Sequence, residues 1–334
     1  MKDSFGNHRE IESQLKSKRI LYRSSEVPVR FAFEKELREH NKTKRMFPEI
    51  NPYCEVYQFR DNMYGIFSES MDGMGDPWSY VIIGPEKAML IDTGFGVGDL
   101  KGLVEAILPR KMELIVVNTH SHFDHAYGNC QFDKVYAHEA EVPALLSKRN
   151  PHIWDYLFDE EGNCIWTEFD RADIVPFKEY EIIGCPDGHI FNLGGDYEIE
   201  LMFYPGHTCG HAAYLDKKNR ILFAGDQCIY GSLSIGGGAP DDPYRKNASI
   251  TALYKELCKI VSRMDEFDSV FPGHGVLDVS PEMLLNIKDA CERVLKDPTK
   301  CDKVTEREMH GKKMVRYNTM VFLSGYLSYG PDQI

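Results

Sequence analysis

Six consecutive residues concentrate side chains that bind metal ions. His120, His122, Asp124 and His125 form the pattern His-x-His-x-Asp-His. Imidazole and carboxylate groups are suitable ligands for a divalent metal such as zinc. Four such groups within six residues cannot all bind one ion and leave it reactive. The pattern therefore indicates two neighbouring ions, each completed by ligands from elsewhere in the chain.

Three later residues offer the missing ligands in similar settings. His207 and His274 each follow a Pro-Gly pair, which turns the backbone sharply, and Asp226 follows a glycine. Each of the three comes shortly after a predicted strand. Seven candidate ligands at strand ends are hard to explain as coincidental core or surface residues, so we expect a metal centre.

The elements that must position these residues occur in two comparable series. Apolar runs at 81–83 and 88–91 predict a hairpin that ends at Asp92, and runs at 212–215 and 221–224 predict one that ends at Asp226. Further strands are expected at 114–117, before the first histidine motif, and at 269–271. Helical spacing of apolar residues predicts helices at 100–108, 250–264 and 281–295. The two series suggest two packed sheets with helices outside them.

With these residues in place, the sequence resembles the metallo-β-lactamase superfamily over residues 53–300. Besides the ligand motifs, the resemblance includes Asp-Thr-Gly at 92–94 and Gly-His-Thr-x-Gly-His at 206–211. It implies an α+β fold, the αββα sandwich of two mixed β-sheets with helices on the outer faces. His211, which closes the second stretch, resembles a structural position rather than a ligand.

The resemblance also implies a dinuclear centre. Its first ion would be held by His120, His122 and His207, its second by Asp124, His125 and His274, with Asp226 bridging the two and Asp92 orienting ligand histidines. The ions are expected to be zinc, with iron or manganese as alternatives. True zinc β-lactamases lack the bridging aspartate, so Asp226 places the chain closer to the hydroxyacylglutathione hydrolase, lactonase and phosphodiesterase branches. His122 disfavours the flavodiiron pattern, which has an acid there.

The expected activity is hydrolysis of a small thioester, ester or lactone by metal-bound hydroxide. Asp124 is a candidate to pass a proton to the leaving group, and Tyr230 is a candidate to hold the substrate carbonyl. A phosphodiesterase acting on a small phosphodiester, weak β-lactamase-like activity and a metal-stabilised binding module are the alternatives. An intact ligand set argues against the last.

Length and composition limit the classes of protein. The chain has 334 residues, 43% hydrophobic and 27% charged, with a formal net charge of −13, which excludes a disordered or fibrous protein and disfavours a nucleic-acid polymer as partner. The sequence has no apolar run long enough to span a membrane and no signal-peptide pattern, so we expect a cytoplasmic protein that acts on a small molecule. We expect one hydrolase domain at 53–300, with an insertion at about 139–195, a charged and solvated extension at 1–52 and an extended tail at 301–334. The two extensions are compatible with a homodimer.

Two further groups of residues are candidates for the surroundings of the substrate pocket. One is aromatic, and either lines an apolar pocket or packs in the core: Trp78, Trp154, Tyr156, Phe158 and Trp166. The other is the glycine-rich run at 231–240, which lacks the features of a phosphate cradle and is expected to be a flexible loop at the pocket rim.

Overall fold

The computed structural model describes residues 14–20, 33–228, 231–309, 312–323 and 325–334. The chain forms two compact units whose segments alternate along the sequence. Unit 1 comprises residues 1–117, 122–135 and 148–181, and unit 2 comprises residues 118–121, 136–147 and 182–334. The first histidine motif crosses from one unit to the other at the Ser121–His122 peptide bond.

Unit 1 contains a mixed sheet in which six strands follow the order β7-β6-β5-β4-β3-β2. The strands are β2 (Arg45–Phe47), β3 (Asn51–Arg60), β4 (Met63–Ser68), β5 (Trp78–Ile83), β6 (Lys87–Ile91) and β7 (Glu113–Val117). The predicted hairpin is confirmed, because β5 pairs antiparallel with β6 and Ile82 lies opposite Met89. β6 and β7 are parallel. The carboxyl ends of β6 and β7 therefore lie at one edge of the sheet, where Asp92 follows β6.

The helices of unit 1 are short. They are α1 (Phe33–Glu39), α2 (Leu100–Ile107), α3 (Phe123–Ala126) and the 3₁₀ turns η1 (Tyr127–Gln131), η3 (Asp155–Leu157) and η4 (Arg171–Asp173). The predicted apolar face of α2 is buried, and a carboxylate oxygen of Asp99 accepts the Gly102 N–H and caps its first turn. α3 is the helical turn that carries Asp124 and His125.

The described part of the N-terminal extension belongs to unit 1, and most of its residues are exposed or half-buried, in keeping with a solvated segment. Leu15 and Ser17 are buried, and β1 (Lys18–Arg19) pairs with β9 (Thr167–Glu168). β2 adds the last strand to the sheet of unit 1. The charged side chains of this segment stay at least partly exposed, while two short strands attach it to the rest of unit 1.

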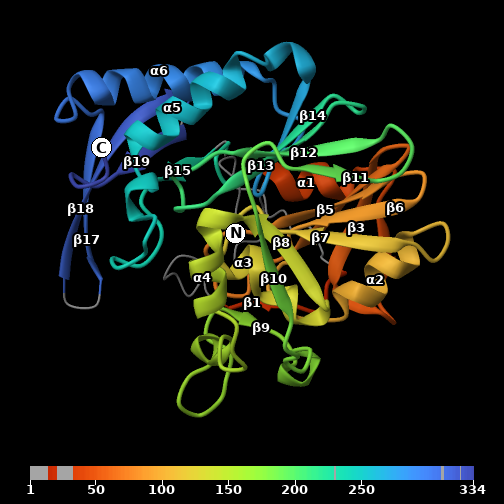
Figure 1. The fold of residues 1–334 in the computed structure, drawn as a ribbon. Coiled ribbons are helices and arrows are strands. Elements are labelled where there is room, and N and C mark those ends of the chain that lie inside the picture. The colour runs from red at the N-terminus through yellow and green to blue at the C-terminus, as the bar shows by residue number, and fades with distance from the viewer. Residues whose placement is uncertain (1–13, 21–32, 229–230, 310–311, 324) are drawn as a thin grey trace. The chain divides into compact units, whose positions relative to one another are not determined.

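Unit 2 contains a five-stranded mixed sheet of order β11-β12-β13-β14-β16 (Figure 1). The strands are β11 (Ile190–Asn192), β12 (Glu198–Phe203), β13 (Ala212–Asp216), β14 (Ile221–Gly225) and β16 (Ser269–Pro272). The second predicted hairpin is confirmed by the antiparallel pairing of β13 with β14, whereas β14 and β16 run parallel. Asp226 therefore follows a strand end, and His274 follows the end of the neighbouring parallel strand.

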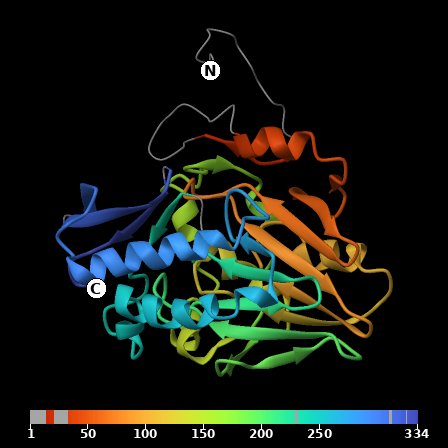
Figure 2. The same ribbon diagram turned by 90° about the horizontal axis from the view of Figure 1, so that it is seen from above.

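Two long helices cover one face of this sheet. α5 (Ile250–Val261) and α6 (Glu282–Lys296) run side by side, as Figure 2 shows. Their apolar residues share one core with alternate residues of the strands, among them Leu215 on β13 and Leu222 on β14. The two helices predicted from the apolar spacing are confirmed, and they pack against the strands that precede the candidate ligands Asp226 and His274.

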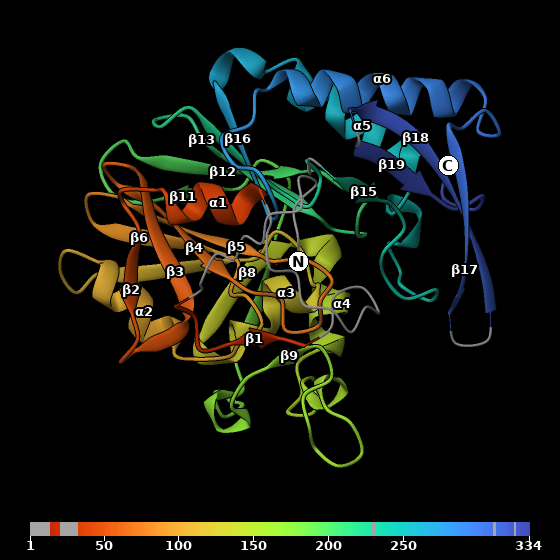
Figure 3. The ribbon, with the colours of Figure 1, turned by 180° about the vertical axis from the view of Figure 1, so that it is seen from behind.

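The remaining elements of unit 2 include a four-stranded sheet of order β15-β19-β18-β17. Its strands are β15 (Ser232–Ser234), β17 (Lys303–Met309), β18 (Lys312–Phe322) and β19 (Gly325–Tyr329). The predicted extended tail forms the last three of these strands, which pair antiparallel in chain order (Figure 3). The prediction of a flexible loop at 231–240 is wrong for residues 232–234, because they form β15 and their main chain pairs with β19. The 3₁₀ turns η5 (Arg245–Asn247) and η6 (Met264–Glu266) flank α5.

Two strands contain a boundary between the units. β8 (Lys134–His138) and β10 (Glu181–Cys185) are hydrogen-bonded neighbours, and β8 is followed by η2 (Glu139–Glu141) and α4 (Val142–Ser147). Mixed sheets combined with a few helices confirm the predicted α+β class. Among the described residues, no helix is long and apolar enough to cross a membrane.

Candidate metal centre

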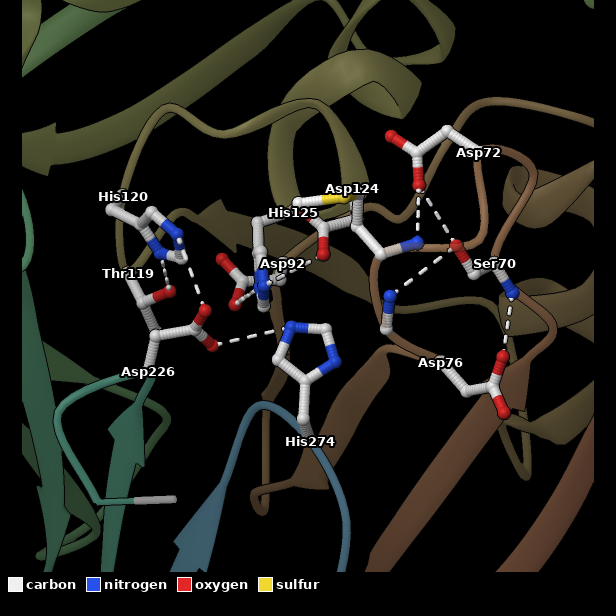
Figure 4. A network of polar contacts seen from close by, with 12 residues as sticks. Ser70, Asp72, Asp76, Asp92, Thr119, His120, Asp124, His125, Asp226 and His274 are labelled. Carbon is white, nitrogen blue, oxygen red and sulfur yellow. Dashed lines mark hydrogen bonds and ion pairs between the residues drawn. The ribbon is translucent and has the colours of Figure 1, made fainter. Parts of the chain in front are cut away.

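Three histidines of unit 2 surround the carboxylate of Asp226. The Nε2 atom of His207 lies 3.4 Å from Oδ2, and Nε2 of His274 lies 3.4 Å from Oδ1. The Nε2 atom of His120 lies 3.9 Å from Oδ2. Figure 4 shows the rings of His120 and His274 directed at this carboxylate. The structure thus brings together all four candidate ligands that belong to unit 2.

A glycine at the end of β14 allows Asp226 to take this position. Gly225 has a φ of 48°, and a Cβ there would lie 2.6 Å from Nε2 of His211 and 2.8 Å from Cβ of Thr119. The backbone therefore passes these two side chains more closely than any other residue allows. The Nε2 atom of His211 accepts the N–H of Asp226 at 3.1 Å, in keeping with the structural role expected for His211.

Two of these histidines have a neighbour on their second ring nitrogen. The Nδ1–H of His207 donates to the carbonyl oxygen of Ser234 at 2.7 Å, and Nδ1 of His120 lies 3.0 Å from Oγ1 of Thr119. A carbonyl oxygen can only accept, so Nδ1 of His207 carries the proton and Nε2 keeps its lone pair for a metal. The strand that supplies Ser234 was the one expected as a loop.

Unit 1 contributes a second set of candidate ligands. The Nδ1–H of His125 donates to Oδ2 of Asp92 at 2.9 Å, and the Nε2 atom of His125 lies 3.6 Å from Oδ2 of Asp124 (Figure 4). The His125 ring is completely buried, whereas His122, at the N-cap of α3, is partly exposed. Asp92 therefore orients a candidate ligand, as the family resemblance implies, and leaves the Nε2 lone pair directed toward Asp124.

The distances within each unit fit a divalent metal ion. Two ligand atoms 2.0–2.1 Å from a tetrahedral ion lie about 3.3 Å apart. The nitrogen–oxygen distances of 3.4–3.9 Å are longer than good hydrogen bonds and close to that separation. The ligand atoms of His120, His207 and Asp226 also lie within 4.8 Å of one another. The donor set, imidazoles around a carboxylate, suits divalent metal binding.

Two buried carboxylates near these sets are not predicted from the sequence. In unit 1, Asp72 accepts the hydroxyl groups of Ser70 at 2.9 Å and Tyr156 at 3.2 Å, and burial raises its pKa. In unit 2, Glu141 is completely buried and accepts three hydrogen bonds. Asp72 lies in a turn-like run of glycines, and Glu141 follows a strand among other acids. Neither pattern distinguishes a buried carboxylate from a surface acid.

The aromatic candidates for a pocket wall separate into different environments. Trp78 is buried against Tyr57 and Phe67, with ring centroids 5.6 and 5.2 Å away, so it belongs to the core of unit 1. Trp154 is also buried and donates its Nε1–H to the carbonyl oxygen of Phe95 at 2.7 Å. The remaining three candidates are at least partly exposed: Tyr156, Phe158 and Trp166. Tyr230 lies outside the described residues.

Trp154 and Phe158 also line a cavity of about 270 Å³ within the predicted insertion. The cavity is otherwise lined by Pro151, Asp155, Arg171, Ile174, Val175, Pro176 and Phe177. The guanidinium carbon of Arg171 lies 4.5 Å from the centroid of the Phe158 ring and thus covers that face of it. Part of the insertion therefore forms a pocket wall of its own.

Comparison with known proteins decides the family. The family model described as the metallo-β-lactamase superfamily matches residues 72–274, which is more than half of the chain. The chain belongs to the metallo-β-lactamase superfamily. It is a hydrolase of that superfamily, and the match contains every one of the seven candidate ligands.

Relatives and a solved structure agree with this assignment. An acyl-coenzyme A thioesterase, MBLAC2, from Bos taurus is 32% identical over 58% of this chain and 71% of its own length. An N-acyl homoserine lactonase from Bacillus cereus is 24% identical over 60% of this chain and 81% of its own. A metallo-β-lactamase family protein from Thermus thermophilus is 18% identical and matches 74% of this chain and 85% of its own with a TM-score of 0.51. This last likeness shows the fold and confirms the predicted metallo-β-lactamase fold.

Proposed function

We propose that this member of the superfamily hydrolyses an acyl thioester, and that esters and lactones are further substrates of the same reaction. The observation that carries the proposal is the Asp226 carboxylate with three imidazole groups around it. The similarity to acyl-coenzyme A thioesterases supports a thioester as the preferred member of the class, and the similarity to a lactonase supports the wider range.

The proposed cofactor is a pair of divalent ions, with zinc as first choice. Their ligands would be the seven residues selected from the sequence: His120, His122, Asp124, His125, His207, Asp226 and His274. Bound there, the ions would lower the pKa of a water molecule toward neutrality and polarise the carbonyl oxygen of the substrate.

The residues of this chain would prepare the site for that chemistry. Ser234 and Asp92 hold the Nδ1–H of His207 and His125, which leaves Nε2 of each ring as the metal-binding atom. We further propose that Asp124 takes up the proton that the attacking water loses and passes it to the sulfur of the leaving group, so that the products are a carboxylic acid and a free thiol. Its carboxylate is almost completely buried, so few water molecules compete for that proton.

The test uses the purified full-length chain and a panel of substrates. We expect the protein to contain tightly bound metal and to hydrolyse acyl-coenzyme A faster than a p-nitrophenyl ester, a lactone or bis-p-nitrophenyl phosphate. Asp226→Asn and His207→Ala should each lose metal and reduce kcat at least 100-fold. Rapid hydrolysis of the phosphodiester alone would contradict the proposal and support the phosphodiesterase alternative. Bound metal without hydrolysis of any substrate would support the binding-module alternative.

The role of Asp124 has a separate test. Asp124→Asn should reduce kcat more for an alkyl thioester than for an ester with a nitrophenol leaving group, which needs no proton at neutral pH. Equal losses for both would contradict a proton-transfer role. The cytoplasmic location, the homodimer and a role for Tyr230 remain predictions.

A further inference from the structure

Glu141 joins two loops of unit 2 through three hydrogen bonds. Its Oε1 atom accepts the N–H of Ser121 at 2.8 Å. Its Oε2 atom accepts the hydroxyl group of Thr208 at 2.9 Å and the N–H of Gly210 at 2.7 Å. The side chain is completely buried, so this carboxylate depends on these donors rather than on water. A single buried carboxylate therefore fastens together donors that lie 20 residues before it and 69 residues after it in the sequence.

Each of two donors lies beside a residue that faces Asp226. Ser121 follows His120, and Thr208 follows His207. The rings of these two histidines are nearly perpendicular, with centroids 4.9 Å apart, and both Nε2 atoms point to the same carboxylate oxygen of Asp226. Glu141 thus accepts hydrogen bonds from the residues that follow the two histidines, Ser121 and Thr208.

The third donor connects Glu141 to Asp226 as well. Gly210 precedes His211, whose Nε2 atom accepts the N–H of Asp226. Gly210 also approaches the main chain of Glu141 so closely that a Cβ there would lie 2.1 Å from the Glu141 nitrogen. The loop that follows His207 is therefore tied to Glu141 by both side-chain hydrogen bonds and main-chain packing.

A carboxylate is required because all three partners are donors. In Glu141→Gln, one oxygen could still accept a hydrogen bond, but the amide nitrogen would bring its own N–H groups toward donors. At least one buried donor would then lose its partner, and the two loops would move apart to relieve the contact. The substitution changes hydrogen bonding and charge with almost no change in volume.

We propose that Glu141 is a positioning residue that holds His120 and His207 at the separation needed to share a metal ion with Asp226. The inference rests on the proposed function, because it concerns the same metal centre. Glu141 acts through the two loops, because its completely buried carboxylate is engaged by Ser121, Thr208 and Gly210.

The test compares the zinc affinity of three full-length proteins by competition with a chromophoric chelator. Glu141→Gln should weaken zinc binding about 10- to 100-fold, the usual effect of removing a group that orients metal ligands. The control is Asp216→Asn, because Asp216 is another completely buried carboxylate of unit 2 with several donors. It accepts the Tyr197 hydroxyl group at 2.7 Å and two main-chain N–H groups at the turn between β13 and β14. It should lower Tm but leave the zinc affinity within a factor of two.

Two gentler variants keep the test decisive if Glu141→Gln does not fold. Thr208→Val removes one hydrogen bond to Glu141 and should weaken zinc binding by a smaller factor, and Thr208→Ser should restore it. In Glu141→Gln and Thr208→Val, kcat at saturating zinc should fall while KM changes little, because Glu141 is completely buried and out of reach of a substrate in solution. In Thr208→Ser and Asp216→Asn, kcat should stay close to that of the wild type.

The outcomes separate the inference from the proposed function. Wild-type protein that binds no zinc, manganese or iron would contradict both. Wild-type protein that binds zinc, with unchanged affinity in both Glu141→Gln and Thr208→Val, would contradict only the inference. An equal loss of affinity in Asp216→Asn would contradict it too, since the effect would then follow from general destabilisation.

Discussion

Nδ1–H of His125 donates to Oδ2 of Asp92, and this hydrogen bond decides which nitrogen of the ring faces Asp124. Both groups are almost completely buried, so water does not compete for the proton. Asp92 has a φ of 62°, a left-handed conformation that aspartate and asparagine adopt more readily than most residues. The substitution that best isolates its charge is therefore the isosteric one.

Asp92→Asn should lower the affinity for the metal ion bound through His125 by about 10-fold or more. A neutral amide is a poorer hydrogen-bond acceptor than a carboxylate, so it makes the imidazole a weaker ligand. The measurement is a zinc titration followed by metal analysis. We expect one ion to be lost at zinc concentrations that saturate both positions in the wild type. A variant that retains both ions with unchanged affinity would show that Asp92 has no such role.

Removal of metal should lower the thermal stability of the wild-type protein. An ion that binds only the folded state stabilises it by about 2.7 kcal/mol when its free concentration is 100 times Kd. Treatment with a chelator should therefore lower Tm by several degrees, and added zinc should restore it. The matched protein is His207→Ala, whose Tm should respond much less to either treatment; an equal response would contradict the assignment of His207.

Gly225→Ala should destabilise the protein because its Cβ would collide with His211 and Thr119. Overpacking together with a left-handed φ should cost roughly 2–4 kcal/mol in the free energy of unfolding, measured by denaturant titration. Gly195→Ala is the matched control, since Gly195 has a φ of 60° and no atom within 4 Å of an added Cβ. It should cost only about 1 kcal/mol. Similar losses in the two variants would mean that crowding at Gly225 is relieved easily.

His138 should make the stability depend on pH. Its ring is buried and stacks on Phe203 with centroids 4.1 Å apart, and burial lowers its pKa from 6.5 to about 4, although Asp187 and Glu256 act in the opposite direction. Nδ1 of the neutral ring also accepts the N–H of Ala140 at 3.2 Å. The unfolded chain binds the proton more readily, so the stabilisation is present above pH 6.5 and is lost as the pH falls toward 4.

The free energy of unfolding should therefore fall by up to about 3 kcal/mol through this one group between pH 6.5 and pH 4. His138→Phe retains a ring against Phe203 but cannot be protonated. We expect a shallower dependence of its unfolding free energy on pH over this window, even if its stability at pH 7 is lower. Parallel curves for the two proteins would contradict the prediction.

The local pattern of the sequence was sufficient to determine the ligand candidates and the elements that carry them. Apolar runs of strand length ended within three residues of Asp92, Asp226 and His274. In each sheet, the side chains that follow two parallel strands are brought to the same edge of that sheet. The glycine before Asp226 was likewise visible in the sequence. The helices α5 and α6 were predictable because their apolar residues recur three and four positions apart, a pattern that is local in the sequence.

Only the tertiary structure determined how those ligands are held. The acceptor for His207 is a carbonyl oxygen 27 residues away, and Glu141 accepts from donors up to 69 residues away. The burial of Leu15 and of Trp78 was decided in the same way, by what the fold packs against each of them. Such contacts join residues that are far apart in the sequence, and they depend on how the chain folds between them. Residue types and local spacing do not determine that fold path.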